Sequence, residues 1–150
     1  MPDQRVRPNE LVRVVFLVLD GMPAPSVATD VTPVLASWCA ASGTTPHTVP
    51  AVLPATTYPN HATFVTGVAP AEHGIVGNHV LCDDGRFRSA RKIGLSVPTI
   101  FDRVTAAGLT STLVVGDQEL VGVMGGTGAG SHWPPGGRVP AGAATDEHGY

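Results

Sequence analysis

The stretch LVRVVFLVLDG, from Leu11 to Gly21, decides how the chain is expected to fold. It is rich in β-branched residues and almost continuously apolar as far as Leu19, and it then changes abruptly to Asp20 and Gly21. An apolar run without alternation is typical of a parallel strand that is covered on both faces. We therefore expect Val12 to Leu19 to form a central strand, with Asp20 at its carboxyl end.

Two helix signals follow this strand. Thr32 and Pro33 supply an N-cap and a favoured first helical residue, and Gly43 closes the apolar stretch 34–41. A segment with three prolines then leads into the polar residues 56–61, after which residues 62–66 look helical until Gly67. In this arrangement a loop delivers polar side chains to the N-terminus of a helix.

A further helix and strand are expected beyond residue 96. Residues 97–107 have helical apolar spacing, with Ser96 as a candidate cap and Gly108 as the end, and Ser111 to Val115 reads as a second buried strand. The alternation of strands and helices predicts an α/β fold with a largely parallel sheet.

The two ends of the chain have a different character. Met1 to Glu10 is polar with two prolines and is interpreted as a flexible leader. Gly116 to Tyr150 is rich in glycine and proline without clear periodicity, which suggests a long functional loop or an unfinished domain.

Composition excludes one class of partner. The 150 residues suit a single domain, and 43% of them are hydrophobic, which is enough for one core. Charged residues make up 14%, the formal net charge is -3, and no run of Lys or Arg occurs, so we exclude a nucleic-acid polymer as partner. The widely separated Cys39 and Cys82 are interpreted as buried thiols rather than a disulfide.

The sequence contains no membrane span. Its longest apolar run, Val14 to Leu19, is far shorter than the ~20 residues that cross a bilayer, and it ends on an acid, unlike a signal peptide. We expect a cytoplasmic location, and an extracytoplasmic one stays open if further sequence precedes Met1. The oligomeric state is not indicated.

Three polar side chains are candidates for chemistry, each with a simpler alternative. Asp20 could bind a metal at the end of its strand, or form a turn with Gly21. Thr57 could meet a phosphate together with the amides of a helix N-terminus, or serve only as the helix cap. Asn78, after the turn 74–77, could donate its amide to an anionic oxygen, or be an ordinary turn residue.

These residues lie within a longer pattern. The string TYPNHATFVTG, from Thr57 to Gly67, is followed by Pro70, His73-Gly74-Ile75 and Asn78, and it is preceded by the strand, Asp20-Gly21 and the helix that ends at Gly43. This combination resembles the nucleotide pyrophosphatase/phosphodiesterase (type I phosphodiesterase) family of the alkaline phosphatase superfamily. The strong part of the resemblance covers Val12 to Asn78, and the later helix and strand fit more loosely.

The resemblance implies a fold and a reaction. It implies an alkaline-phosphatase-like α/β/α sandwich, incomplete in this chain, in which residues 11–150 form the N-terminal part of a hydrolase domain. It also implies a zinc-dependent hydrolase with Asp20 as a zinc ligand, Thr57 as both nucleophile and ligand, and Asn78 steadying a non-bridging phosphate oxygen. Two zinc ions ~4 Å apart would hold the attacking and leaving oxygens in line, with a phosphothreonine intermediate on Thr57. Asp20 and Thr57 are expected to open onto the same edge of the sheet, within ~15 Å of each other, because ions reach ligands only at ~2 Å.

Other residues that could suggest sites are interpreted as structural. His61, His73 and His79 occupy positions that in this family support the loops of the site, so we do not assign them as zinc ligands. The glycine-rich stretch Gly125 to Gly130 has neither GxGxxG spacing nor a Walker lysine, and we do not expect it to bind phosphate.

The chain departs from the family pattern in its metal ligands. The resemblance calls for two further aspartates and three histidines, and none is recognisable, since Asp146-Glu147-His148 has the wrong spacing. We therefore expect the N-terminal portion of a longer enzyme that is inactive alone, with a complete chain acting as a non-catalytic phosphate-binding or interaction module as the alternative. The expected substrate is a small phosphate ester or nucleotide. The absence of arginine from the motif favours diesters, although Arg86, Arg88 and Arg91 lie close in sequence.

Overall fold

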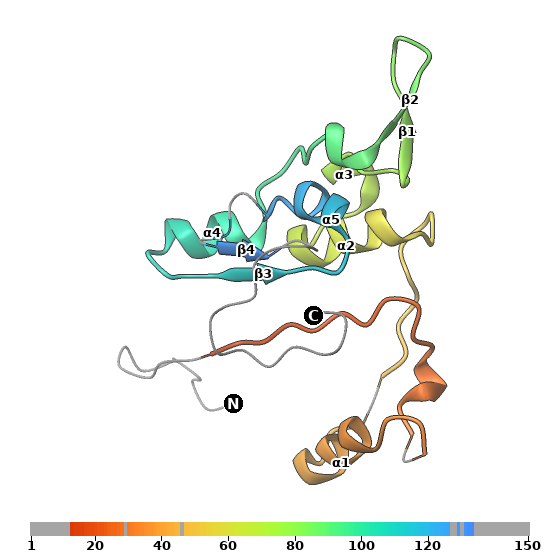
Figure 1. The fold of residues 1–150 in the computed structure, drawn as a ribbon, viewed down its shortest axis with the longest axis vertical. Helices are drawn as coiled ribbons and strands as arrows, with labels where there is room; N and C mark the ends of the chain where they lie inside the picture. Colours follow the sequence, from red (N-terminus) through yellow and green to blue (C-terminus); the bar gives the residue numbers. More distant parts are fainter. Residues whose placement is uncertain (1–12, 29, 46, 127–128, 130, 134–150) are drawn as a thin grey trace, which may run out of the picture. The chain divides into compact units, whose positions relative to one another are not determined.

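The computed structural model describes residues 13–28, 30–45, 47–126, 129 and 131–133 (Figure 1). Residues 131–133 are described by their backbone alone. The chain divides into two compact units, residues 1–48 and residues 49–150. The expected leader, Met1 to Glu10, lies outside the described residues.

The first unit contains one α-helix among its described residues, and the predicted limits of this helix are confirmed. A 3-10 turn, η1 (Ala24–Ser26), precedes α1 (Pro33–Ser42), and Gly43 ends α1 in the left-handed region at φ 64°. Thr32 is the N-cap residue as predicted, but its hydroxyl donates to the Ser26 carbonyl at 2.7 Å and makes no side-chain bond to α1.

The predicted central strand, Val12 to Leu19, is wrong for the residues that the structure describes. Residues 13–19 have no regular secondary structure, and the Val15 side chain is 89% exposed. A strand needs a neighbour to receive its backbone hydrogen bonds, and the described part of this unit contains no other strand. Asp20 and Gly21 form a turn directly after this segment.

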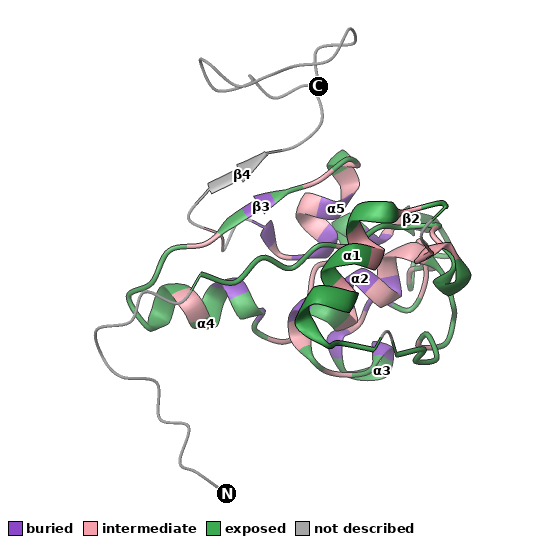
Figure 2. Cartoon of the chain, turned by 90° about the horizontal axis from the view of Figure 1, so that it is seen from below, coloured by how far each residue is buried: buried purple, intermediate pink, exposed green. Residues whose placement is uncertain are grey.

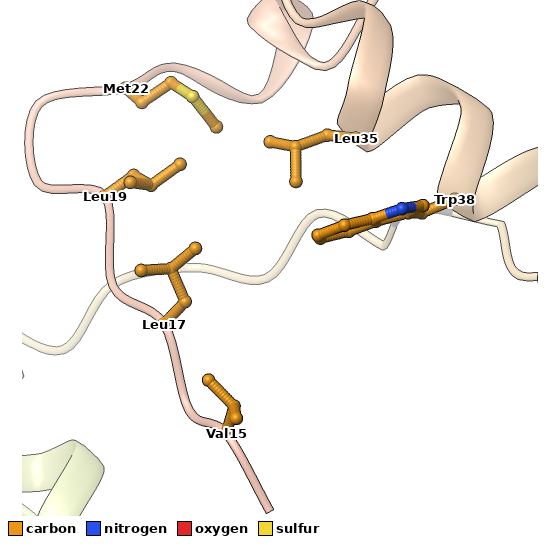
Figure 3. Close-up of a pocket in the computed structure, with 6 residues that line it drawn as sticks. All are labelled: Val15, Leu17, Leu19, Met22, Leu35 and Trp38. Carbon is orange, nitrogen blue, oxygen red and sulfur yellow. The ribbon is translucent and has the colours of Figure 1, made fainter. Parts of the chain in front are cut away.

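The apolar run instead lines one side of an open pocket. The side chains of the run and of α1 face each other across it (Figure 3). The lining residues are Val15, Leu17, Leu19, Met22, Leu35 and Trp38.

The second unit begins with the helix of the motif. After a cis peptide bond between Leu53 and Pro54, α2 (Thr57–Thr66) starts five residues earlier than the expected Ala62, because a proline at its third position is tolerated in a first helical turn. Gly67 ends it at φ 74°, a left-handed conformation that residues with a Cβ rarely adopt, and α3 (Pro70–His73) follows.

A hairpin that we did not expect comes next. Strands β1 (His79–Leu81) and β2 (Phe87–Ser89) pair antiparallel, with Val80 opposite Arg88, and the 3-10 turn η2 (Ala90–Lys92) continues from them.

The expected helix and strand beyond residue 96 are present with changed limits. Helix α4 (Ile100–Ala106) is capped by Thr99 and not by Ser96, in a capping box with Asp102. Strand β3 (Thr112–Val114) pairs parallel with β4 (Ser131–Trp133), and only Leu113 of β3 is buried. Because the sheet of β1 and β2 is antiparallel, a largely parallel sheet stays a prediction. Helix α5 (Gln118–Val123) lies where we expected no periodic structure, so that expectation is wrong there.

The core of the second unit lies where α2 meets α3, α4 and α5. Figure 2 shows buried positions on these helices and on β3. The buried apolar residues are Ala62, Val65, Ile75, Ala90, Phe101, Leu113, Leu120, Val123 and Met124. The chain is thus a mixed α/β protein, while a larger parallel sandwich stays a prediction.

Two smaller expectations concern the cysteines and the membrane. Cys39 and Cys82 are free thiols, as expected, but both are half-buried and not buried. In the part of the chain that the structure describes, no helix has the length and apolar character of a membrane span.

Candidate active site

Thr57 is the first residue of α2 and not its cap. The N-cap residue is Thr56, with extended backbone and no side-chain capping bond, so the cap alternative for Thr57 is wrong. The Asn60 side chain holds the approach to this point, since its amide donates to the Thr56 carbonyl at 2.9 Å and its oxygen accepts from the Val52 N–H at 3.1 Å. The loop before Thr57 is therefore tied to the helix that follows it.

The first turn of α2 offers fewer free amides than a helix N-terminus usually does. The Tyr58 N–H donates to the Asn78 side chain, Pro59 has no N–H, and the Asn60 N–H points to the Thr56 carbonyl at 3.5 Å. Within the described residues, only the Thr57 N–H of this turn has no assigned partner. A bound anion would thus depend on side-chain donors more than the sequence suggested.

Asn78 lies beside the start of α2. Its Oδ1 accepts the Tyr58 N–H at 3.0 Å, and its backbone carbonyl accepts the Ala90 N–H at 3.0 Å. Because a backbone N–H can only donate, the side-chain oxygen must face Tyr58, and the Nδ2 group keeps both of its hydrogens for another acceptor. The structure therefore brings Asn78 to the residue next to Thr57.

Tyr58 links the start of α2 to a residue that the sequence did not single out. Its hydroxyl donates to Asp117 Oδ2 at 2.8 Å, and Asp117 Oδ1 caps α5 by accepting the Glu119 N–H at 2.9 Å. Burial, then the bond to Asp117 and the nearby carboxylates, raise the pKa of Tyr58 to about 12. Asp117 follows β3 at its carboxyl end, and this position after a strand was the signal that could have identified it.

Two of the three histidines make hydrogen bonds within the fold, while their exclusion as zinc ligands stays a prediction. His61 Nδ1 donates to the Thr57 carbonyl at 2.8 Å, so its ring lies behind the candidate nucleophile. Buried His73 uses both nitrogens: Nδ1 accepts the Ile75 N–H at 3.1 Å, and Nε2 donates to the Thr63 hydroxyl at 3.0 Å. Burial lowers the pKa of His73, which favours the neutral ring. His79 is exposed at the start of β1, and its role stays a prediction.

Two of the nearby arginines are engaged by carboxylates. Arg88 pairs with Asp84 within the hairpin, and Arg91 pairs with Glu119 at 3.1 Å. Neither guanidinium is therefore free to clamp a substrate oxygen without losing its partner. Arg86 is exposed beside the hairpin turn.

The glycine-rich stretch has a packing role where it is described. A Cβ on Gly126 would lie 2.5 Å from Leu113 Cδ2, and one on Gly125 would lie 2.7 Å from Thr99 Cγ2. These glycines allow close packing against β3 and the start of α4. The rest of the stretch, except Ala129, and Asp146-Glu147-His148 lie outside the described residues.

The described residues supply few of the metal ligands that the candidate site would need. Asp20 is exposed in its turn in the first unit, and its distance from Thr57 stays a prediction. Among the residues that the structure describes, no group of three or more His, Cys, Asp or Glu could hold a metal ion.

Comparison with known proteins identifies the family. The model of the type I phosphodiesterase/nucleotide pyrophosphatase family matches residues 14–142. An uncharacterized pyrophosphatase/phosphodiesterase of Schizosaccharomyces pombe is 39% identical over 66 residues, a stretch that covers 44% of this chain and 13% of the relative. No solved structure matches. Since the family model covers most of its length, the chain belongs to the type I phosphodiesterase/nucleotide pyrophosphatase family.

Proposed function

We propose that this chain carries the nucleophile of a metal-dependent hydrolase that cleaves phosphodiester or nucleotide pyrophosphate bonds through a phosphothreonine intermediate on Thr57. The observation that supports this most is the 3.0 Å contact between the Tyr58 N–H and Asn78 Oδ1. It brings the amide of Asn78 to the residue that follows Thr57, so that a hydroxyl nucleophile and an amide donor can meet one phosphoryl group.

The donor chemistry of the chain fits part of a zinc site. The Asp20 carboxylate and the Thr57 hydroxyl are oxygen donors that zinc accepts, but two ligands do not complete a tetrahedral site. In this proposal Asp20 and Thr57 contribute to a site of two zinc ions, and the remaining aspartates and histidines come from residues outside the described part of the chain. Bound zinc would lower the pKa of the threonine hydroxyl, which is otherwise a poor nucleophile.

The residues of the chain then have separate tasks in the reaction. Thr57 Oγ1 gives up its proton to solvent and attacks phosphorus, and the bond from phosphorus to the leaving oxygen breaks with its electron pair going to that oxygen. Asn78 Nδ2 donates to a non-bridging oxygen as negative charge develops on it. His61, through the Thr57 carbonyl, and Asn60, through the Thr56 carbonyl, hold the backbone on either side of the attacking atom. Water then cleaves the threonine ester and restores the hydroxyl.

The arginine contacts favour diesters and pyrophosphates over monoesters. A monoester carries an extra charged oxygen, which enzymes commonly bind with a free guanidinium. Arg88 and Arg91 are already paired with Asp84 and Glu119. We therefore infer a small diester or nucleotide substrate.

The test of the nucleophile uses the protein translated from the whole reading frame. Thr57→Ala should abolish zinc-dependent release of a chromogenic alcohol from an activated diester, because the attacking atom is deleted. Thr57→Ser should retain measurable turnover, because it keeps a hydroxyl. Thr66→Val is the matched control, since it removes a hydroxyl that bonds to Ala62 at the far end of α2. Near-native turnover in Thr57→Ala, with contaminating enzyme excluded, would reject the assignment.

A second candidate is a non-catalytic phosphate-binding or interaction module. It is favoured by the lack of a metal-binding cluster among the described residues. Reading the DNA beyond the codon for Tyr150 separates the two candidates: an in-frame Asp-x-x-x-His pair, Asp-His pair and later His support the hydrolase, whereas a stop codon there supports the module.

A further inference from the structure

A closed circuit of contacts surrounds the start of α2. It begins at Tyr58, whose hydroxyl donates to Asp117 and whose backbone N–H donates to Asn78. From Asp117 it passes to Glu119, the second residue of α5, through the cap bond to the Glu119 N–H. One side chain is therefore connected both to the amide of the candidate site and to the end of another helix.

The circuit returns to Asn78 through the hairpin. The Glu119 carboxylate accepts from the Ser89 hydroxyl and pairs with Arg91. The residue between these two, Ala90, donates its N–H to the Asn78 carbonyl at 3.0 Å. Asn78 is thus held through its side chain from α2 and through its backbone from the segment that Glu119 anchors.

From this circuit we propose that Asp117, acting through the Tyr58 hydroxyl, is a positioning residue that fixes the Asn78 amide relative to Thr57; the inference rests on the proposed function. Asp117 touches neither candidate side chain. It holds the Tyr58 ring, and it therefore holds the Tyr58 N–H that orients Asn78 Oδ1.

Physical chemistry supports a positioning role over one of stability alone. The first turn of a helix is prone to fray, and a donor displaced by ~1 Å can lose about 10²-fold in rate. The Tyr58–Asp117 bond joins two residues 59 positions apart in sequence, and it holds the first turn of α2 through the Tyr58 side chain. Because the pKa of Tyr58 is about 12, its hydroxyl stays a donor throughout the neutral range.

The test compares two variants that break this bond in different ways. Tyr58→Phe removes the hydroxyl and keeps the ring, and Asp117→Ser keeps a capping oxygen for α5 while losing the reach to Tyr58. Each should lower kcat about tenfold with KM within about twofold, because the amide acts on the transition state. Thr66→Val should leave both constants unchanged.

A double variant separates positioning from general damage to the fold. If Asp117 and Tyr58 act through Asn78, Tyr58→Phe should lower kcat by less than about twofold in a protein that already carries Asn78→Ala. The NMR signals of the Asn78 side-chain amide should also shift in Tyr58→Phe and stay in place in Thr66→Val.

Each result bears on a different claim. Wild-type kcat in Tyr58→Phe and Asp117→Ser, or a full tenfold loss on top of Asn78→Ala, would overturn the positioning role. If Tyr58→Phe fails to fold, Asp117→Ser decides by the same criteria. If the wild-type protein translated from the whole reading frame showed no zinc-dependent turnover, the proposed function would be rejected instead, and the Asn78 signals would still report whether Tyr58 holds the amide.

Discussion

At the scale of single residues, Asn78 is the side chain whose orientation matters most for the proposed chemistry. Its oxygen is occupied by the Tyr58 N–H, so only its two amide hydrogens can meet a phosphate. Asn78→Ala should lower kcat by roughly 10² to 10³, the usual effect of losing one donor aimed at transition-state charge. Steady-state kinetics on the activated diester measures this, and unchanged kinetics would leave Asn78 as a turn residue.

His73 provides a second residue-scale prediction, on pH. Burial holds its folded-state pKa below the ordinary 6.5, so the unfolded chain binds more protons between the two values and the folded state loses stability as pH falls through about 6.5. Protonation would also place a hydrogen on Nδ1, which now accepts the Ile75 N–H. The test measures the melting temperature at about pH 7.5 and about pH 5.5, on either side of the ordinary histidine pKa. The melting temperature should change less between these two pH values in His73→Asn than in the wild type, because asparagine keeps an acceptor but does not titrate.

A histidine control makes this result specific. His79→Asn changes an exposed histidine of the same unit and should preserve the wild-type difference between the two pH values. An equal pH response in wild type and His73→Asn would show that His73 does not account for the dependence.

At the scale of elements, the start of α4 distinguishes two candidate caps. The Thr99 hydroxyl and backbone N–H both bond to Asp102, and these bonds hold the pKa of Asp102 below its ordinary value. Thr99→Val keeps the shape of this buried side chain but removes the cap, and should lower the free energy of unfolding by about 1 kcal/mol. Ser96→Ala, at the cap that the sequence suggested, should change it little in urea titrations. The reverse order of effects would restore Ser96 as the cap.

The elements differ in how far local sequence could predict them. The limits of α1 and the end of α2 were predictable because Pro33, Gly43 and Gly67 act through local backbone conformation. The strand expected at Val12 to Leu19 depended on a neighbour that no local pattern supplies. The hairpin could have been predicted from a local turn signal, the Asp84-Gly85 pair between its strands.

The residues of the candidate site also differ in how far the sequence could predict them. Thr57 and Asn78 could be proposed from the motif, since they lie close together along the chain. Asp117 could not be linked to them, because its contact with Tyr58 spans 59 residues and depends on how α5 packs against α2. Pairings of this kind are set by tertiary structure rather than by any spacing along the chain.

At the scale of the whole molecule, the 150-residue chain should show no catalytic phosphodiesterase activity even with excess Zn²⁺. In the proposed site Asp20 and Thr57 alone are too few ligands for zinc, and among the described residues no group of three or more His, Cys, Asp or Glu could hold a metal ion. Large apolar side chains are also exposed, with Val15 at 89% and Leu53 at 82%. We therefore expect a partly ordered or self-associating protein that binds a hydrophobic dye.

The activity of the 150-residue chain is measured by titrating zinc in the presence of a chromogenic diester, with Thr57→Ala as the control. Zinc-dependent turnover that disappears in the control would show that this chain can form a working site by itself. The extra ligands would then come from His61, His73, His79, His132 or a second copy of the chain.

During synthesis of the chain, the two contacts of Tyr58 become possible at different times. Asn78 is only 20 residues from Tyr58, so this contact can form soon after the segment leaves the ribosome, whereas Asp117 is synthesised about 40 residues later. At about 5–20 residues per second, translation leaves an interval of roughly 2 to 8 s between the two. During this interval Asn78 is the only one of the two partners of Tyr58 that has been synthesised, and the Tyr58 hydroxyl can gain its Asp117 acceptor only when the start of α5 emerges.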